Sequence, residues 1–266
     1  MCLDIAFYSA LELIDDYFPG LVHDGEIPFD LDLGAHVLAM GYSRYPVITQ
    51  DQGAYHRKYF EWCIVAEYMN SPEKIRAMRP KMANARAEKL LDPKAFWHRI
   101  RKNRCLIPVT GIYEHREISG WKNKVPYYVQ VKDRKMFCIP GLYYYNRNLA
   151  DPETGELKGM FSLITRDGNP LMRQIHNGGD NAFRMPLFLN QELERKWLDP
   201  SLSDEEMARI VQYEIPSETL EYHTVFSIRG RTPRPDGKPK NAFFEFPNLP
   251  PLGSGGSGPA PDLFSN

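Results

Sequence analysis

Short runs of β-branched and aromatic residues, each bounded by turn residues, restrict this 266-residue chain to a fold built mainly from strands. The clearest runs cover residues 127–131, 135–139, 160–165 and 184–189. Helical spacing is confined to residues 9–18, 93–103, 190–198 and 203–213, with Ser9, Asp92, Asn190 and Ser203 as the expected capping residues. We therefore predict an α+β fold, with mostly antiparallel β-sheets forming a barrel-like core and helices at its periphery.

The composition changes sharply near the end of the chain. Residues 247–266, PNLPPLGSGGSGPAPDLFSN, consist largely of Pro, Gly, Ser and short polar residues, which is typical of a linker. We predict one domain over residues 1–246 and a flexible tail over 247–266. The final Leu-Phe pair fits either a short docking motif or an unstructured end.

Charge is distributed unevenly on a chain whose net charge is only -1. Residues 1–32 hold eight Asp or Glu and no Lys or Arg, whereas residues 74–104 hold eleven Lys or Arg against two acidic residues. A second basic stretch, RGRTPRPDGKPK, covers residues 229–240. These stretches indicate either a local anionic ligand, with a phosphate backbone as the first candidate, or solvated surface faces.

The four cysteines, Cys2, Cys63, Cys105 and Cys138, form no CxxC pair and have no histidine at a zinc-site spacing. We therefore expect neither a metal nor another cofactor, and a reducing, cytoplasmic environment. No signal peptide is expected, because Asp4 and Glu12 interrupt the N-terminal stretch, and no apolar run is long enough to span a membrane.

Cys2 directly follows the initiator methionine, and its small side chain permits removal of Met1. The mature chain would then carry a free α-amine and a thiol on one residue, a pair of nucleophiles that an internal cysteine does not have. The alternative is an inert second residue. The amine can condense with an aldehyde, and the thiol can then close a five-membered thiazolidine ring.

Four segments in order, MC at 1–2, NARAE at 84–88, RCLIPVTGIYEH at 104–115 and NPLMRQIHN…RMPLFL at 169–189, resemble the SOS response-associated peptidase family. Its members include proteins that crosslink to abasic sites in single-stranded DNA. The resemblance implies capture of such sites through Cys2 as a thiazolidine. We also expect a monomer, with a replication-associated protein as a partner for the tail. A thiol N-terminal-nucleophile peptidase and a non-catalytic DNA-binding module are the alternatives.

The same resemblance implies roles for three further residues around Cys2. Glu114 matches the catalytic glutamate, and its apolar neighbours Ile112 and Tyr113 are expected to raise its pKa by desolvation. His176 matches the catalytic histidine, which acts as a general acid or base. Asn84 is expected to hydrogen-bond and orient the reacting N-terminal residue.

Three arginines are expected to bind DNA. Arg86 would hold a phosphate, with a salt bridge to Glu88 or Glu114 as the alternative. Arg104 and Arg184 are further candidates by their positions in the motifs, with helix capping or packing as the alternative for both.

The chain departs from the family pattern at two places near these residues. Leu3 and Asp4 stand where the family start reads Gly-Arg, which replaces a cation by an anion beside Cys2. The six residues GGDNAF, at 178–183, are inserted before Arg184 and lengthen a loop expected to border the site.

Overall fold

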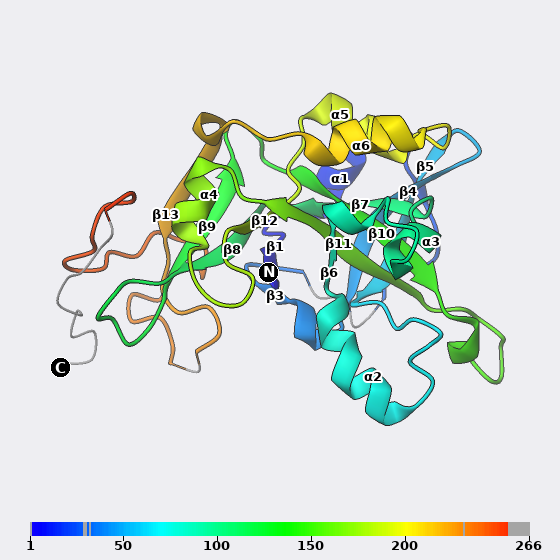
Figure 1. Ribbon diagram of the computed structural model, residues 1–266, viewed down its shortest axis with the longest axis horizontal. Coiled ribbons are helices and arrows are strands. Elements are labelled where there is room, and N and C mark those ends of the chain that lie inside the picture. Colours follow the sequence, from blue (N-terminus) through cyan, green and yellow to red (C-terminus); the bar gives the residue numbers. More distant parts are fainter. Residues whose placement is uncertain (1, 29–30, 32, 231, 255–266) are drawn as a thin grey trace.

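The computed structural model describes residues 2–28, 31, 33–230 and 232–254, and it contains two β-sheets (Figure 1). The smaller, five-stranded sheet has the order β13-β9-β8-β1-β3. Its strands are β13 (Leu220–Thr224), β9 (Val125–Val131), β8 (Gly111–Arg116), β1 (Asp4–Ala6) and β3 (Val37–Leu38). All four pairings in this sheet are antiparallel.

The larger, eight-stranded sheet has the order β12-β11-β10-β7-β4-β5-β2, with β6 paired to β11. Its strands are β12 (Arg184–Pro186), β11 (Gly159–Asp167), β10 (Phe137–Tyr145), β7 (Arg104–Val109), β4 (Arg44–Asp51), β5 (Ala54–Trp62), β2 (Val22–His23) and β6 (Asn84–Arg86). A short parallel contact pairs Met160 and Phe161 of β11 with Glu61 and Trp62 of β5. This contact bends the sheet into a partial ring, so the α+β prediction is confirmed, but a complete barrel is not formed.

The helices lie at the periphery, as expected. They are α1 (Glu12–Tyr17), α2 (Pro72–Met78), α3 (Phe96–Arg99), α4 (Pro170–Ile175), α5 (Gln191–Leu198) and α6 (Asp204–Gln212). Short 3₁₀ turns cover Ala39–Gly41, Arg79–Met82, Ala87–Lys89, Arg147–Leu149 and Ser217–Thr219. In Figure 1, α1, α5 and α6 gather on one side of the larger sheet, and α2 lies on the other.

Two of the four predicted caps are confirmed. Asn190 accepts a hydrogen bond from the backbone of Leu193, and Ser203 forms a capping box with Glu206. Helix α1 begins after Leu11 and α3 after Ala95, and neither has a side-chain cap, so the expected caps Ser9 and Asp92 are wrong. Asp92 instead accepts a hydrogen bond from the backbone of Lys94 in the turn before α3.

The chain passes from the larger sheet to the smaller one between β7 and β8, which places Glu114 next to the N-terminal strand. Gly111, the first residue of β8, pairs with Ala6 of β1. A Cβ atom at Gly111 would lie only 2.2 Å from the ring of Tyr128, so glycine is needed for this close approach. Strand β1 therefore sits in the middle of the molecule (Figure 1).

The packed part of the chain continues beyond residue 246, where the tail was predicted to start. The guanidinium of Arg116, which is buried, donates hydrogen bonds to the carbonyls of Pro250 (2.6 Å) and Pro251 (2.9 Å). Leu249 and Leu252 pack against the hydrophobic core. Residues 247–254 are thus held on the domain by contacts that composition does not reveal, and the rest of the predicted tail lies outside the described residues.

Candidate active site

Cys2 lies immediately before β1 and is buried, with 1% of its surface exposed. Its backbone carbonyl accepts a hydrogen bond of 2.8 Å from Nδ2 of Asn84, the first residue of β6. This contact joins two segments that are 82 residues apart. The amide of Asn84 therefore holds the start of the chain, as predicted, and its Oδ1 is buried with no hydrogen-bond partner among the described residues.

Glu114 lies in the middle of β8, one strand away from the start of the chain. Burial raises the pKa of its carboxyl from 4.5 to about 7, which agrees with the expected effect of desolvation. Its Oε1 is buried and has no hydrogen-bond partner in the described part of the chain. A carboxyl with this pKa can either give or take a proton near neutral pH.

His176 follows α4, a helix that begins with the Asn169 cap and Pro170. Nδ1 of the imidazole is 2.7 Å from the carbonyl oxygen of Arg184, and because a carbonyl only accepts, Nδ1 carries the proton. Nε2 then presents a lone pair and lies 3.9 Å from Oε2 of Glu114. Burial lowers the pKa of His176 to about 4, so the ring is neutral at neutral pH.

The thiol of Cys2 is not activated by its surroundings. Burial raises its pKa well above 9.0, and the nearby carboxylates of Glu114 and Asp4 raise it further. The buried residue is therefore a thiol, and not a thiolate, at neutral pH. A reaction at this sulfur needs a neighbouring base.

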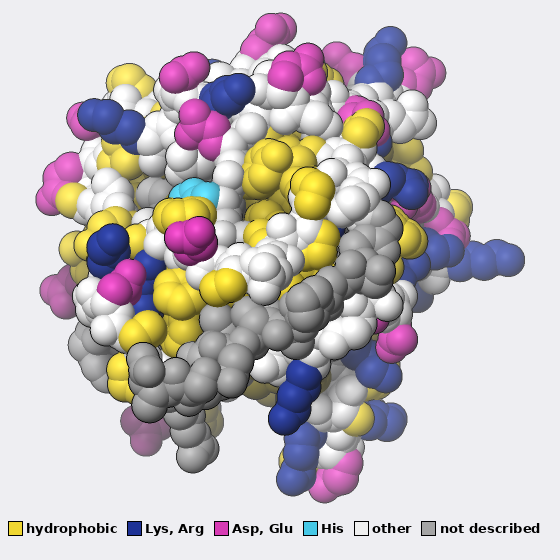
Figure 2. Space-filling view, turned by 90° about the vertical axis from the view of Figure 1, so that its left-hand side faces the viewer, with side chains coloured by type: hydrophobic (Ala, Val, Ile, Leu, Met, Phe, Trp, Pro, Cys, Tyr) yellow, Lys and Arg dark blue, Asp and Glu magenta, His cyan; other side chains and the backbone are white. Residues whose placement is uncertain are grey.

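The carboxyl of Glu114 and the imidazole of His176 line a cleft of about 550 Å³. Its other walls come from the N-terminal strand, the loop after β8 and the segment after β13, and include Leu3, Asp4, Lys124, Ile228, Arg229 and Phe246. The end of the molecule that faces the viewer in Figure 2 is hollowed, and hydrophobic side chains gather around the hollow. This cleft is large enough for a sugar and its neighbouring groups.

A second, more polar cleft of about 410 Å³ lies on the Asn84 side of the same centre. Its lining residues are Lys81, Asn84, Arg86, Thr165, Asp180, Asn181 and Arg184. The inserted loop 178–183 contributes to both clefts, with Gly178 in the first and Asp180 and Asn181 in the second. The predicted residues Cys2, Asn84, Glu114 and His176 thus lie together between two clefts.

The three predicted DNA-binding arginines differ in their surroundings. Arg86 is exposed and donates a hydrogen bond of 2.9 Å to Asn181. Arg184 is bound by the carboxylates of Glu88 and Asp167. Arg104 is buried, and its guanidinium donates to the backbone carbonyls of Trp197 and Asp199, which supports the packing alternative for this residue.

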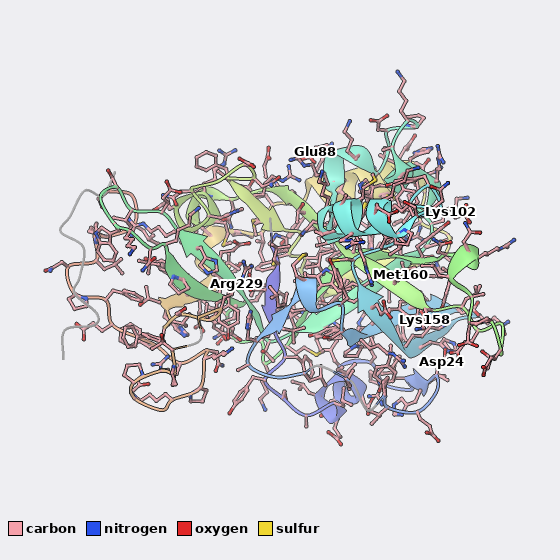
Figure 3. All side chains as sticks on the ribbon, turned by 90° about the horizontal axis from the view of Figure 1, so that it is seen from below. Asp24, Glu88, Lys102, Lys158, Met160 and Arg229 are labelled. Atoms are coloured by element: carbon pink, nitrogen blue, oxygen red, sulfur yellow. The ribbon has the colours of Figure 1, made fainter. Side chains whose placement is uncertain are left out.

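The carboxylate of Asp4, two residues after Cys2, forms an ion pair with an arginine 225 residues later in the chain. This buried carboxylate binds the guanidinium of Arg229 through both oxygens and lies 2.7 Å from Nε2 of His36. These partners lower the pKa of Asp4 despite its burial. Figure 3 shows Arg229 beside the N-terminal strand. Arg229 belongs to the basic stretch 229–240, which is evident in the sequence, but the sequence does not indicate that its partner is Asp4.

We expect Arg229→Ala to destabilise the fold, because Asp4 would keep a buried charge without the guanidinium that now binds both of its oxygens. Arg229 is partly exposed, so the free energy of unfolding should fall by roughly 1–3 kcal/mol, less than for a fully buried pair. Urea denaturation at pH 7 measures this change. Lys238→Ala removes a positive charge from the same stretch at an exposed position and should change little; equal losses in both variants would contradict the role of the ion pair.

The raised pKa of Glu114 also predicts a pH-dependent stability. A carboxyl that is harder to ionise in the folded state contributes stability in full below pH 4.5, and this contribution is lost as the pH rises through about 7. At pH 8 the loss amounts to roughly 3 kcal/mol. Glu114→Gln should therefore unfold with about 1–3 kcal/mol more free energy than the natural chain at pH 8, and with a similar value near pH 4.5.

Urea denaturation of both proteins from pH 4.5 to pH 8 tests this expectation. Glu117→Gln, at an exposed glutamate on the loop after β8, should follow the natural chain at every pH. A difference between Glu114→Gln and the natural chain that stays constant with pH would show that this carboxyl ionises normally.

No group of metal-binding side chains occurs in the described part of the chain. None of the helices described has the length and apolar character that crossing a bilayer requires.

A family model described as SOS response associated peptidase (SRAP) matches residues 35–228. The abasic site processing protein YoqW of Bacillus subtilis is 31% identical over 148 residues, which cover 56% of this chain and 61% of that protein. The abasic site processing protein HMCES of Pongo abelii is 26% identical over 178 residues, covering 56% of this chain and 48% of that protein. The chain thus spans about three fifths or less of these curated relatives.

The fold is also similar to solved structures. A crystal structure of a protein from Bacteroides thetaiotaomicron superposes with a TM-score of 0.70 at 32% identity, covering 85% of this chain and 92% of that one. A crystal structure of a protein from Bordetella bronchiseptica gives a TM-score of 0.66 at 21% identity, over 85% of this chain, which supports the fold alone.

Proposed function

Because this chain belongs to the SOS response-associated peptidase family, we propose that it binds single-stranded DNA at abasic sites and captures the sugar aldehyde through Cys2 after Met1 is removed. The observation that carries the proposal is the hydrogen bond from Asn84 to the carbonyl of Cys2. It fixes the reacting residue beside a carboxyl and a neutral imidazole. The curated relatives are named abasic site processing proteins, which supports abasic sites as the target.

The first step joins the α-amine of Cys2 to C1′ of the ring-opened sugar. The amine nitrogen attacks the aldehyde carbon, and the carbonyl oxygen takes up a proton to give a carbinolamine. Glu114, with a pKa of about 7, is protonated in part of the molecules at neutral pH and gives a proton to the departing hydroxyl. Water leaves, and a protonated imine remains beside the Glu114 carboxylate.

The second step closes the ring. The sulfur of Cys2 attacks the carbon of the protonated imine and a C–S bond forms. The C=N π electrons move to the nitrogen, which keeps its proton and becomes the secondary amine of a thiazolidine. Because burial keeps the thiol protonated, its proton must pass to a base, and the Glu114 carboxylate formed in the first step is beside it. The whole sequence consumes one aldehyde and releases one water molecule.

Neutral His176 serves as a second proton carrier. Its Nδ1 proton is held by the carbonyl of Arg184, so the lone pair is on Nε2, which lies 3.9 Å from Oε2 of Glu114. That nitrogen can take the carboxyl proton during ring closure and return it when the ring opens. Slow reversal of the adduct would use the same two groups.

The DNA strand would run past the centre from one cleft to the other. Arg86 is the predicted arginine whose guanidinium is exposed on the second cleft, so we assign the phosphate contact to it. Lys81 in the same cleft and Lys124 in the first supply further positive charge. Arg184 forms ion pairs with Glu88 and Asp167. We therefore assign it a structural role, which is to fix the end of the inserted loop.

The test is incubation of the purified chain with single-stranded DNA that carries one abasic site, followed by denaturing electrophoresis. We expect a denaturation-resistant adduct with this strand and none with the undamaged strand. A peptidase acting by the same thiol would regenerate Cys2 at each turnover and leave no adduct. A non-catalytic module would bind the strand equally well after alkylation of the thiol.

A further inference from the structure

Phe183, the last residue of the inserted loop, combines an exposed aromatic ring with an unfavourable backbone. Its side chain is 44% exposed, and its φ of 64° lies in the left-handed region. A bulky residue seldom adopts this conformation, and the strain persists only where the surroundings fix it. A single exposed phenylalanine is common on protein surfaces, but one held in a strained backbone requires an explanation.

The backbone around Phe183 is fixed on both sides. Its N–H donates to the carbonyl of His176 (2.7 Å), and its own carbonyl accepts from the N–H of Gly168 (2.6 Å). The next carbonyl along the chain, that of Arg184, accepts from Nδ1 of the His176 imidazole. The backbone of Phe183 is therefore hydrogen-bonded to His176, whose imidazole is the proposed proton carrier.

One cation lies over this ring, and another contacts the same loop. The guanidinium of Arg173 lies over it, 5.6 Å from its centroid, and is itself held by a hydrogen bond of 3.0 Å to the carbonyl of Gly168. Two residues before Phe183, the side chain of Asn181 accepts a hydrogen bond from Arg86 in the second cleft. An aromatic ring beside backbone-binding cations is the arrangement by which proteins hold single-stranded nucleic acid, because bases stack on the ring while phosphates meet the cations.

We propose that Phe183 stacks on the base next to the abasic site and thereby positions the damaged sugar against Cys2. This inference rests on the proposed function, because it takes single-stranded DNA as the ligand. It adds a residue from the inserted loop 178–183 to the binding site. The hydrogen bond from Phe183 to the backbone of His176 holds this exposed residue on the segment that carries the proposed proton carrier.

Binding can be separated from crosslinking in a Cys2→Ala background, with a strand that carries a tetrahydrofuran in place of the abasic sugar. We expect Phe183→Gly to weaken the affinity for this strand about 5- to 100-fold by fluorescence anisotropy. Glycine accepts a φ of 64° without strain, so this variant should fold with an unchanged or higher Tm. Phe183→Trp should keep the affinity.

Tyr222 provides the matched control, because it is also 44% exposed but lies on β13 and packs against Tyr127. Tyr222→Ala should bind the strand as the natural side chain does. A 2-aminopurine placed on the 5′ or the 3′ side of the tetrahydrofuran identifies the stacked base. Its fluorescence should be quenched on one side by protein that retains Phe183, and on neither side by the Phe183→Gly variant.

Equal affinity of the Phe183→Gly variant and the protein that retains Phe183 would overturn the stacking role, and so would a lack of any binding to the strand. If the natural chain forms the adduct while Phe183→Gly leaves affinity unchanged, the stacking inference fails and the proposed function stands. If binding depends on Phe183 but no adduct forms with an aldehyde-bearing strand, the proposed function fails and the stacking stands.

Discussion

A Cys2→Ala variant is expected to form no denaturation-resistant thiazolidine adduct with single-stranded DNA that carries an abasic site. Alanine keeps the α-amine but removes the sulfur, so the reaction stops at the imine, which water reverses. A tag that cannot be removed from the N-terminus should abolish the adduct as well, because it leaves the thiol but blocks the amine. Denaturing electrophoresis after heating separates stable adducts from imines.

Cys105→Ala is the matched control. Cys105 is also fully buried, but it lies in β7 at the centre of the larger sheet. This variant should crosslink at the natural rate if it remains folded. An adduct of unchanged yield and heat stability from Cys2→Ala, or from the blocked N-terminus, would rule out thiazolidine formation.

Glu114→Gln is expected to slow adduct formation about 10²- to 10⁴-fold at pH 7, because glutamine has the shape of the carboxyl but neither gives nor takes a proton. In the natural chain, protonated and ionised Glu114 coexist around pH 7, the pKa to which burial raises it. The natural rate should therefore be highest near pH 7 and fall on either side, whereas the residual rate of Glu114→Gln should lose this dependence. Single-turnover measurements from pH 5.5 to pH 8.5 test both points.

His176 does not obscure this profile, because burial lowers its pKa to about 4 and the ring stays neutral over the measured range. Glu117→Gln, with an exposed side chain on the loop after β8, is the control for a change of charge near the cleft. A Glu114→Gln variant that reacts within threefold of the natural rate would show that this carboxyl moves no proton in the slow step. Urea denaturation of Glu114→Gln at pH 8 then shows whether residue 114 occupies its buried position in the folded variant.

The sequence was most informative where short-range signals decide the structure. Asn190 and Ser203 cap their helices because each is followed at once by helix-forming residues that need an acceptor. The apolar neighbours Ile112 and Tyr113 predicted a desolvated Glu114, and burial does raise its pKa. Asn84 was expected to hold Cys2, and it does so through the carbonyl of that residue.

Long-range contacts could not be predicted from the sequence. The pairing of Asp4 with Arg229 spans 225 residues, and nothing in either local sequence selects the partner. The contact of Arg116 with Pro250 likewise anchors a segment whose composition is that of a linker. Arg104 was expected to bind DNA because its neighbours match a motif. In the structure it is buried, and its guanidinium donates to two backbone carbonyls, which supports a packing role.

Positions with a strained backbone could not be predicted from the sequence either. Cys63, the residue after β5, adopts a φ of 73°. Glycine adopts this left-handed backbone most readily, so a cysteine at this position conflicts with the usual preference. Phe183 repeats the same conflict beside His176, and no periodicity in the sequence signals it.

Mass spectrometry of the purified adduct tests the central proposition most directly. The protein is incubated with an oligonucleotide that carries one abasic site, and the product is digested and sequenced. We expect the adduct mass to equal the protein without Met1 plus the oligonucleotide minus one water molecule, with the DNA fragment on Cys2. An adduct mapped to a lysine, or a reactive protein that still carries Met1, would contradict the mechanism.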